Sequence, residues 1–247
     1  MPYSGTLDVA PLVADAPLMP GFDAEPWQIE HVDVLQATWE IDDRAFATNL
    51  PPALHPTIPP IVIFSVARYP ESPAGPFTLA QVRLGCRAAA LPRGFLLQAY
   101  CDSPHACDEL SRNWGLRCAV AHVRLHRYHD RIEATVRTES AEILRVSLVD
   151  PEPISGGDVQ YVASMHLART AADGGVLVQV DPDYRFHRAE RGRPDLAAFD
   201  RRAWAADDIE PVYPIVASFT QCDTGFPRIR YMLDPSKPAV VGTRKLR

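Results

Sequence analysis

Lysine is almost absent from this chain: of 25 basic residues only Lys237 and Lys245 are lysines, both close to the C-terminus. Any mechanism that needs a lysine in the middle of the chain is therefore excluded. Long apolar runs are also missing, since none approaches the roughly 18–20 residues that span a bilayer. The first fifteen residues lack the basic and apolar regions of a signal peptide. We therefore expect a protein that does not contact membranes.

Cysteine pairs of the CxxC type do not occur either. The chain has five cysteines, an odd number, which favours reduced thiols and a cytoplasmic location: Cys86, Cys101, Cys107, Cys118 and Cys222. Cys101 and Cys107 flank His105, but their spacing fits no familiar zinc pattern. We expect these thiols to be buried and not to bind a metal.

Three histidines lie close together at His122, His126 and His129. On a helix, His122 and His126 would share one face. The residues around them alternate as in a strand instead, and neighbouring arginines would repel a cation. We therefore interpret this segment as a solvated strand and turn, and we expect neither a metal nor a cofactor.

The charge balance argues against a nucleic-acid partner. The formal net charge is −6 and the isoelectric point is about 5.7, whereas nucleic-acid-binding surfaces are basic. The arginines between residues 185 and 193 lie among acidic residues, so ion pairs on a solvated face explain them better. The sequence also has neither a phosphate-binding glycine loop nor a G-x-S-x-G motif. These general signals exclude functions but do not identify one.

Short strand-like segments separated by turn residues dominate the chain. Proline is frequent, with 24 residues against 13 glycines, and it marks loops and strand borders. Helices are expected over 105–113 and from Asp42 or Asp43 to Asn49, and residues 149–158 look like a hinge. The pattern predicts a mainly β (α+β) fold with one or two short helices and strands over 31–39, 61–66, 79–87, 94–100, 120–125, 131–136, 161–169, 177–180, 184–191, 212–220 and 229–233.

Five stretches, taken in order, resemble the acetoacetate decarboxylase superfamily: 42–54, 75–78 with the strands up to Tyr100, 109–118 with 130–136, 186–200, and 226–231. The likeness covers residues 28–235. We therefore expect one such domain there, an irregular N-terminal arm over 1–27 and a C-terminal tail over 236–247. The resemblance implies a cone-like antiparallel β-barrel or wrapped sheet, and a homo-oligomer.

The resemblance also implies a chemistry that this chain cannot perform in the usual way. Members of the family form a Schiff base between a lysine and a small keto acid, which requires a lysine that is neutral near pH 7. When Trp114-Gly115 is matched to the family's "WG(F)PKK", Arg117 falls on the proline, Cys118 on the Schiff-base lysine and Ala119 on its cationic neighbour.

A second register gives the same result. If the match is anchored on Glu109-Leu110-Ser111, Gly115 and Leu116 take the lysine positions. Neither register provides an amine. The family's other pocket residues are also replaced: its acidic residues fall near Ser65 and Leu79, and its N-terminal arginine falls near His31 or Val32.

The first of three competing hypotheses is an enzyme that kept the pocket and changed the reaction. Hydrogen-bond donors or an arginine would then stabilise an enolate. It would dehydrate, cyclise or isomerise a small carbonyl or carboxylate compound, for example in secondary metabolism. The candidate catalytic residues are Arg117, Cys118, Glu109, Tyr100 and Ser65, and the candidate substrate-binding residues are Gln81, Trp114, Leu79 and His31.

Several of these residues have a plainer explanation as well. Arg117 could anchor a carboxylate or form a surface ion pair. Glu109 or His31 could carry a proton. Cys118 could be a nucleophile, or a small residue that fills the space of the missing lysine.

The other two hypotheses concern the whole protein. One is a non-catalytic subunit that binds a small molecule in a sealed apolar pocket or serves as a structural partner. The other is a residual decarboxylase in which Lys237 reaches back from the tail into the cavity.

Overall fold

Strands make up most of the structure, a computed structural model that describes residues 4–42 and 46–246. The strands are β1 (Leu18–Met19), β2 (Trp27–Ile41), β3 (His55–Pro56), β4 (Ile61–Tyr69), β5 (Phe77–Ala88), β6 (Leu91–Cys101), β7 (Cys118–Val120), β8 (His122–Arg127), β9 (Arg131–Arg137), β10 (Glu142–Pro153), β11 (Ser164–Thr170), β12 (Gly174–Val180), β13 (Arg185–Phe199), β14 (Pro211–Phe226), β15 (Tyr231–Leu233) and β16 (Thr243–Lys245). The helices are α1 (Ala10–Ala14), α3 (Pro104–Trp114) and α4 (Ala239–Gly242), with 3₁₀ turns η1 (Ala47–Asn49) and η2 (Gly156–Asp158).

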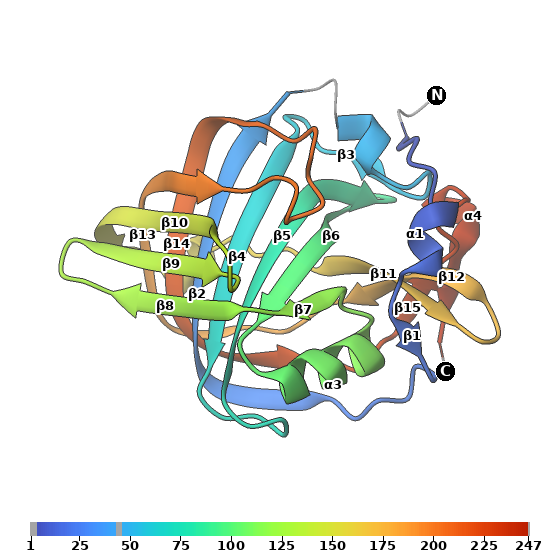
Figure 1. Cartoon of the computed structure of the whole chain (residues 1–247), viewed down its shortest axis with the longest axis horizontal. Helices are drawn as coiled ribbons and strands as arrows, with labels where there is room; N and C mark the ends of the chain where they lie inside the picture. The colour runs from blue at the N-terminus through green and yellow to red at the C-terminus, as the bar shows by residue number, and fades with distance from the viewer. Residues whose placement is uncertain (1–3, 43–45, 247) are drawn as a thin grey trace.

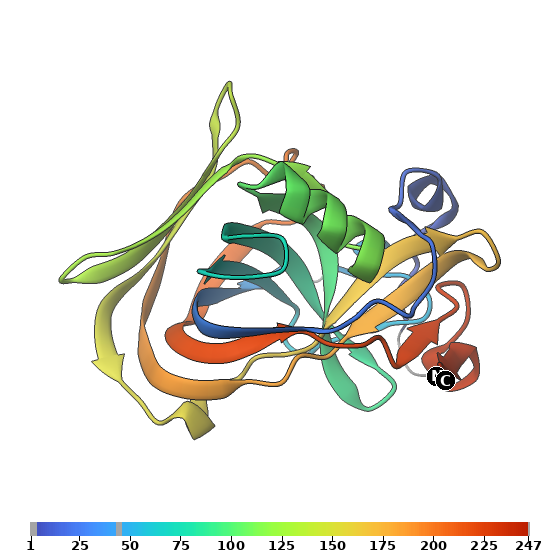
Figure 2. The ribbon, with the colours of Figure 1, turned by 90° about the horizontal axis from the view of Figure 1, so that it is seen from below.

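Within the described residues, all sixteen strands join one sheet (Figure 1). Its main path runs β16-β15-β12-β11-β6-β5-β4-β2-β14-β13-β10-β9-β8, with β1, β3 and β7 paired at the side. Strand β8, at one end of the path, packs back against β4, β5 and β6. The sheet therefore curls on itself, as Figure 2 shows from below. The predicted mainly β, wrapped fold is confirmed.

The sheet is mixed, although we expected it to be antiparallel. Strand β6 pairs in parallel with both β7 and β11, and β1 pairs in parallel with β11. Between β6 and β7 the chain passes through helix α3, which returns it in the same direction. A crossover of this kind is what a parallel pair requires.

Two hydrophobic cores lie on opposite faces of the curled sheet, because successive residues of a strand point to opposite sides. Leu35 and Phe64 belong to the first core, which β8, β9 and β10 help to enclose. Val34 and Leu79 belong to the second core, which α3, β11 and β12 cover. The second core surrounds the cavity described below.

Helix α3, predicted over 105–113, is confirmed and covers the second core. It begins at Pro104 after the cap residue Ser103, whose hydroxyl accepts a hydrogen bond from the Ala106 N–H. It ends at Trp114, and the cap residue that follows, Gly115, has φ 63°. A Cβ at Gly115 would lie 2.7 Å from the Ala168 Cβ, so both backbone conformation and space favour glycine here.

Other segments differ from expectation. Residues 149–158 are not a hinge, since β10 runs to Pro153 and η2 follows. The N-terminal arm contains α1 and the parallel strand β1, and the tail contains α4 and β16. In the region of the other predicted helix the structure shows η1, and its alternative cap Asp43 lies outside the described residues. No helix in residues 4–42 and 46–246 is long and apolar enough to cross a membrane.

Candidate active site

A cavity of about 50 Å³ lies on the face of the sheet that carries the second core. It is called the polar cavity below, and it is lined by Val34, Ser65, Ala67, Tyr69, Leu79, Gln81, Arg83, Val162, Ser164, His166, Val180, Pro182, Tyr184, Thr224, Gly225 and Phe226. At roughly 10–15 Å³ for each water-sized group, this volume holds about three to five such groups. The cavity therefore suits a very small ligand.

Arg83 brings a positive charge to the polar cavity. Its side chain is buried, with Nη2 donating to Gln36 Oε1 at 3.1 Å and Nη1 to the Val162 carbonyl at 3.3 Å. Its Nε–H has no partner, and no carboxylate forms an ion pair with it in the described part of the chain. Burial lowers the pKa of Arg83, but a guanidinium keeps its proton in proteins. The cavity thus holds an uncompensated cation.

His166 brings an unpartnered base. The residue is 1% exposed, and its Nδ1 lies 2.7 Å from the carbonyl oxygen of Trp114. A carbonyl only accepts, so Nδ1 carries the proton. Burial lowers the pKa of His166 to about 4, which keeps the ring neutral at pH 7. Its Nε2 therefore has a free lone pair, and it has no partner among the described residues.

Two tyrosines and a threonine add neutral hydroxyls. Burial raises the pKa of Tyr184 to about 12 and also raises that of Tyr69, so both are protonated and able to donate. Thr224 Oγ1 is buried without a partner. In the described chain, four buried side-chain polar atoms lack a hydrogen bond, and three of them belong to Arg83, His166 and Thr224. Buried polar groups are almost always paired, so this concentration indicates a ligand site.

Comparison with known proteins identifies the family. A sequence profile of acetoacetate decarboxylase (ADC) matches residues 15–225, most of the chain. The chain belongs to the acetoacetate decarboxylase family. The comparison with curated proteins gives no match.

Solved structures agree with this fold. The ADC of Legionella pneumophila subsp. pneumophila str. Philadelphia 1 has a TM-score of 0.74 at 18% identity, over 83% of this chain and 86% of that one. The enduracididine biosynthesis enzyme MppR complexed with pyruvate has a TM-score of 0.68 at 15% identity, over 92% and 96%. An ADC-like enzyme from Sphingomonas wittichii RW1 has a TM-score of 0.59 at 15% identity, over 83% and 92%. At such identities the likeness shows the fold alone.

Three of the predicted site residues line the polar cavity of this ADC-family chain: Ser65, Leu79 and Gln81. Ser65 and Leu79 are the positions near which the resemblance placed the family's acidic residues. Neither carries a carboxylate here, and Arg83 instead supplies a cation. The local charge of the cavity is therefore positive.

Cys118 lies on the same face of the sheet, further along. The strand registers align Ser65 with Gln81, Gln81 with Ala99, and Ala99 with Cys118. Cys118 is therefore two strand spacings beyond Gln81, or about 10 Å. Its thiol is free and donates to the Ala119 carbonyl at 3.9 Å. The neighbouring thiols of Cys101 and Cys107, together with burial, raise its pKa. A thiol in that state is a poor nucleophile.

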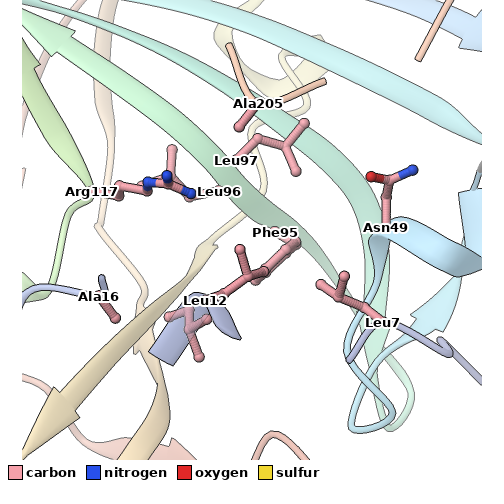
Figure 3. A pocket seen from close by; sticks show the side chains of 10 residues that line it. Leu7, Leu12, Ala16, Asn49, Phe95, Leu96, Leu97, Arg117 and Ala205 are labelled. Atoms are coloured by element: carbon pink, nitrogen blue, oxygen red, sulfur yellow. The ribbon is translucent and has the colours of Figure 1, made fainter. Parts of the chain in front are cut away.

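Arg117 lines a different, mainly apolar pocket of about 140 Å³ (Figure 3). Its walls include Leu7 and Leu12 of the N-terminal arm and Phe95 and Leu97 of β6. Arg117 and Ser65, both predicted as catalytic, thus belong to separate pockets.

The remaining predicted residues lie elsewhere. The Tyr100 hydroxyl donates to the Ala203 carbonyl in the first core, and Glu109 accepts a hydrogen bond from Asn113 on α3. Trp114 donates from its indole to the Pro227 carbonyl, and its own carbonyl orients His166. His31 is exposed on β2 and lies beside His187 and Asp223.

Neither lysine lines the polar cavity. Lys237 Nζ is 2.7 Å from Asp234 Oδ2, and its side chain is 60% exposed. Lys245 is exposed on β16. A residual decarboxylase would need Lys237 inside the cavity. The structure instead places Lys237 at the surface, where it pairs with Asp234.

Arg83 and His166 were missed by reasoning from the sequence, although both left a signal. Arg83 follows Leu79 and Gln81 at the same two-residue spacing on a buried strand, which places all three on one face. His166 lies between the apolar residues Met165 and Leu167, in a segment that is predicted as a strand. A polar side chain on a buried strand needs hydrogen-bond partners. Here His166 Nδ1 has one, and Nε2 has none among the described residues.

Proposed function

We propose that this ADC-family chain is an enzyme that moves a proton on a small compound carrying a carbonyl beside a carboxylate, without forming an imine to lysine. The observation that carries this proposal is that one cavity is lined by both Arg83, a cation without an ion-pair partner, and His166, whose Nε2 has no hydrogen-bond partner. The related MppR was solved with pyruvate, a compound of this class.

Arg83 would hold the substrate by its negative charge. Its unpaired Nε–H can donate to a carboxylate or enolate oxygen, and attraction between charges is stronger in a buried site than in water. Because the guanidinium is already fixed by Gln36 and Val162, little reorganisation is needed when charge develops. This makes Arg83 both an anchor and a stabiliser of an enolate.

His166 would accept the proton. Its Nε2 takes a proton from the carbon next to the carbonyl, and a new N–H bond forms. The C–H electron pair becomes a carbon–carbon double bond, and the π electrons of the carbonyl move onto its oxygen to give an enolate. With a pKa of about 4, the imidazolium is unfavourable unless an anion lies close. The enolate between His166 and Arg83 would provide that anion.

The fate of the enolate decides the product. If the imidazolium returns its proton to a different atom, the reaction is an isomerisation. If it protonates a hydroxyl on the neighbouring carbon, water leaves, a double bond forms and the reaction is a dehydration. Cyclisation follows if the enolate carbon attacks a second electrophile in the same molecule.

The test is solvent exchange on pyruvate in D₂O, followed by the decay of the methyl signal in proton NMR. The wild-type chain should accelerate exchange, and His166→Asn should abolish the acceleration. Arg93→Met is a matched control, because Arg93 is also buried with an unpaired Nε but pairs with Asp181 and does not line the cavity. Binding of pyruvate without exchange would favour the non-catalytic subunit. Absence of both binding and exchange would contradict the proposal.

We also propose that the chain forms a homo-oligomer. Several apolar side chains are exposed, including Ile58, which is 98% exposed, and Tyr213. Light scattering of the purified chain tests this independently, and a mass of 27.3 kDa at micromolar concentration would contradict it.

A further inference from the structure

His31, His187 and Asp223 lie together on three neighbouring strands. Their ligating atoms all lie within 4.8 Å of one another, and His187 Nε2 is 2.7 Å from Asp223 Oδ1. Both histidines are exposed and Asp223 is half-buried. Within residues 4–42 and 46–246, no other three histidine, cysteine or acidic side chains come this close.

The backbone is irregular where these residues occur. His31 has φ 55°, which is uncommon outside glycine, and its N–H donates to Asp223 Oδ1 at 3.1 Å. The register between β14 and β2 shifts at Asp223, and that between β13 and β14 shifts at His187. Such bulges re-aim side chains and often occur at functional sites. Here they bring together three residues from separate strands.

We propose that His31, His187 and Asp223 bind a divalent transition-metal ion such as Zn²⁺. Imidazole and carboxylate groups are suitable ligands for zinc, cobalt, nickel and copper. The exposed position leaves room for water to complete the coordination. The hydrogen bond from His187 Nε2 to Asp223 occupies a ligand position. Metal binding therefore breaks this bond: the proton of the neutral ring moves to Nδ1, and Nε2 coordinates the ion through its lone pair.

The site is distinct from the polar cavity but shares its strands. Asp223 immediately precedes Thr224, and Tyr184 lies three residues before His187; both Thr224 and Tyr184 line the cavity. A bound ion would therefore tie together β2, β13 and β14 behind that wall. No step of the proposed reaction uses this ion, so either proposal can fail without the other.

The experiment is calorimetric titration of Zn²⁺ into the untagged, chelator-treated chain. The wild type should bind one ion at this site. His187→Ala and Asp223→Asn should each weaken binding at least roughly 10-fold, the lower end of the loss for even an outer-shell partner. Cys118→Ala and His126→Ala are matched controls for the other thiol and histidine clusters, and they should leave binding unchanged.

A second probe keeps the test decisive if one of these variants does not fold. His31→Ala removes only an exposed ring, and it should also weaken Zn²⁺ binding. With Cu²⁺ in place of Zn²⁺, electron paramagnetic resonance should show nitrogen couplings from two imidazoles in the wild type and one in His31→Ala. Absence of saturable binding would overturn the proposal, as would binding lost in Cys118→Ala or His126→Ala but kept in His31→Ala.

Discussion

Replacing Arg83 with methionine should leave the chain folded while removing its affinity for small carboxylates. Methionine keeps most of the volume of the buried stem, which packs against Gly94. It removes the charge and the hydrogen bonds to Gln36 and Val162. Stability and ligand binding should therefore respond very differently.

The effect on stability is a difference between two terms of similar size. Two acceptors lose their donor, at about 1–3 kcal/mol each. Against this, the desolvation of an unpaired ion, which costs several kcal/mol, disappears. The free energy of unfolding should consequently change by less than about 3 kcal/mol. An arginine with only a structural role, in a fully paired network, would instead cost about 3–5 kcal/mol when removed.

The effect on binding has no such compensation. Truncating one member of a buried, hydrogen-bonded charge pair costs about 2–5 kcal/mol. At 1.4 kcal/mol for each factor of ten, this lowers the affinity for pyruvate by roughly 30-fold to several thousand-fold. Calorimetric titration with pyruvate and urea unfolding of the same samples measure both quantities.

Arg93→Met separates the cavity from burial in general. It should retain pyruvate binding, whatever it does to stability. Unchanged binding in Arg83→Met, or equal losses of binding in the two variants, would refute the role of Arg83.

Four further predictions concern other residues. Because burial lowers the pKa of His166 from 6.5 to about 4, the unfolded chain binds more protons between these values. The free energy of unfolding should therefore fall by about 3 kcal/mol as the pH drops from 6.5 to 4. This contribution should be absent from His166→Gln. Equal pH profiles of the wild type and His166→Gln in urea unfolding would contradict the prediction. Borohydride reduction with pyruvate should leave no adduct on Lys237, which pairs with Asp234 at the surface; a mass increase on that peptide would restore the imine hypothesis. Cys118→Ala should keep the rate of pyruvate exchange within about twofold of wild type; loss of exchange would make Cys118 a catalytic residue. In the wild type, iodoacetamide should alkylate Cys118 slowly, because the pKa of its thiol is raised. Gly115→Ala should destabilise the chain by more than about 1 kcal/mol, measured by thermal unfolding, since its φ is positive and the new Cβ meets Ala168; an unchanged Tm would mean that the helix end relaxes.

The strands could be predicted where the local pattern is strong. Residues 61–66 form the start of β4, and 131–136 nearly all of β9, because both are continuous or alternating apolar segments between turn residues. Strand β10 was missed because Pro151 and Pro153 suggest a loop. The structure accommodates these prolines beside a register shift between Val149 and Glu152, where regular pairing is already interrupted.

The candidate site could be predicted only in part, for a physical reason. Ser65, Leu79 and Gln81 lie on two strands that are consecutive in the chain, so a local pattern and a family resemblance sufficed to place them together. His166 comes from β11, which reaches this face through a parallel pairing with β6. No local sequence pattern predicts that long-range contact, and none predicts the two register shifts that bring His31, His187 and Asp223 together.

The most direct measurement is a crystal structure of the chain soaked with pyruvate. Our account predicts an intact molecule in the polar cavity, with a carboxylate oxygen within hydrogen-bonding distance of Arg83 Nε and its methyl carbon facing His166 Nε2. Pyruvate bound instead beside Arg117 in the apolar pocket, or joined covalently to a lysine, would contradict it.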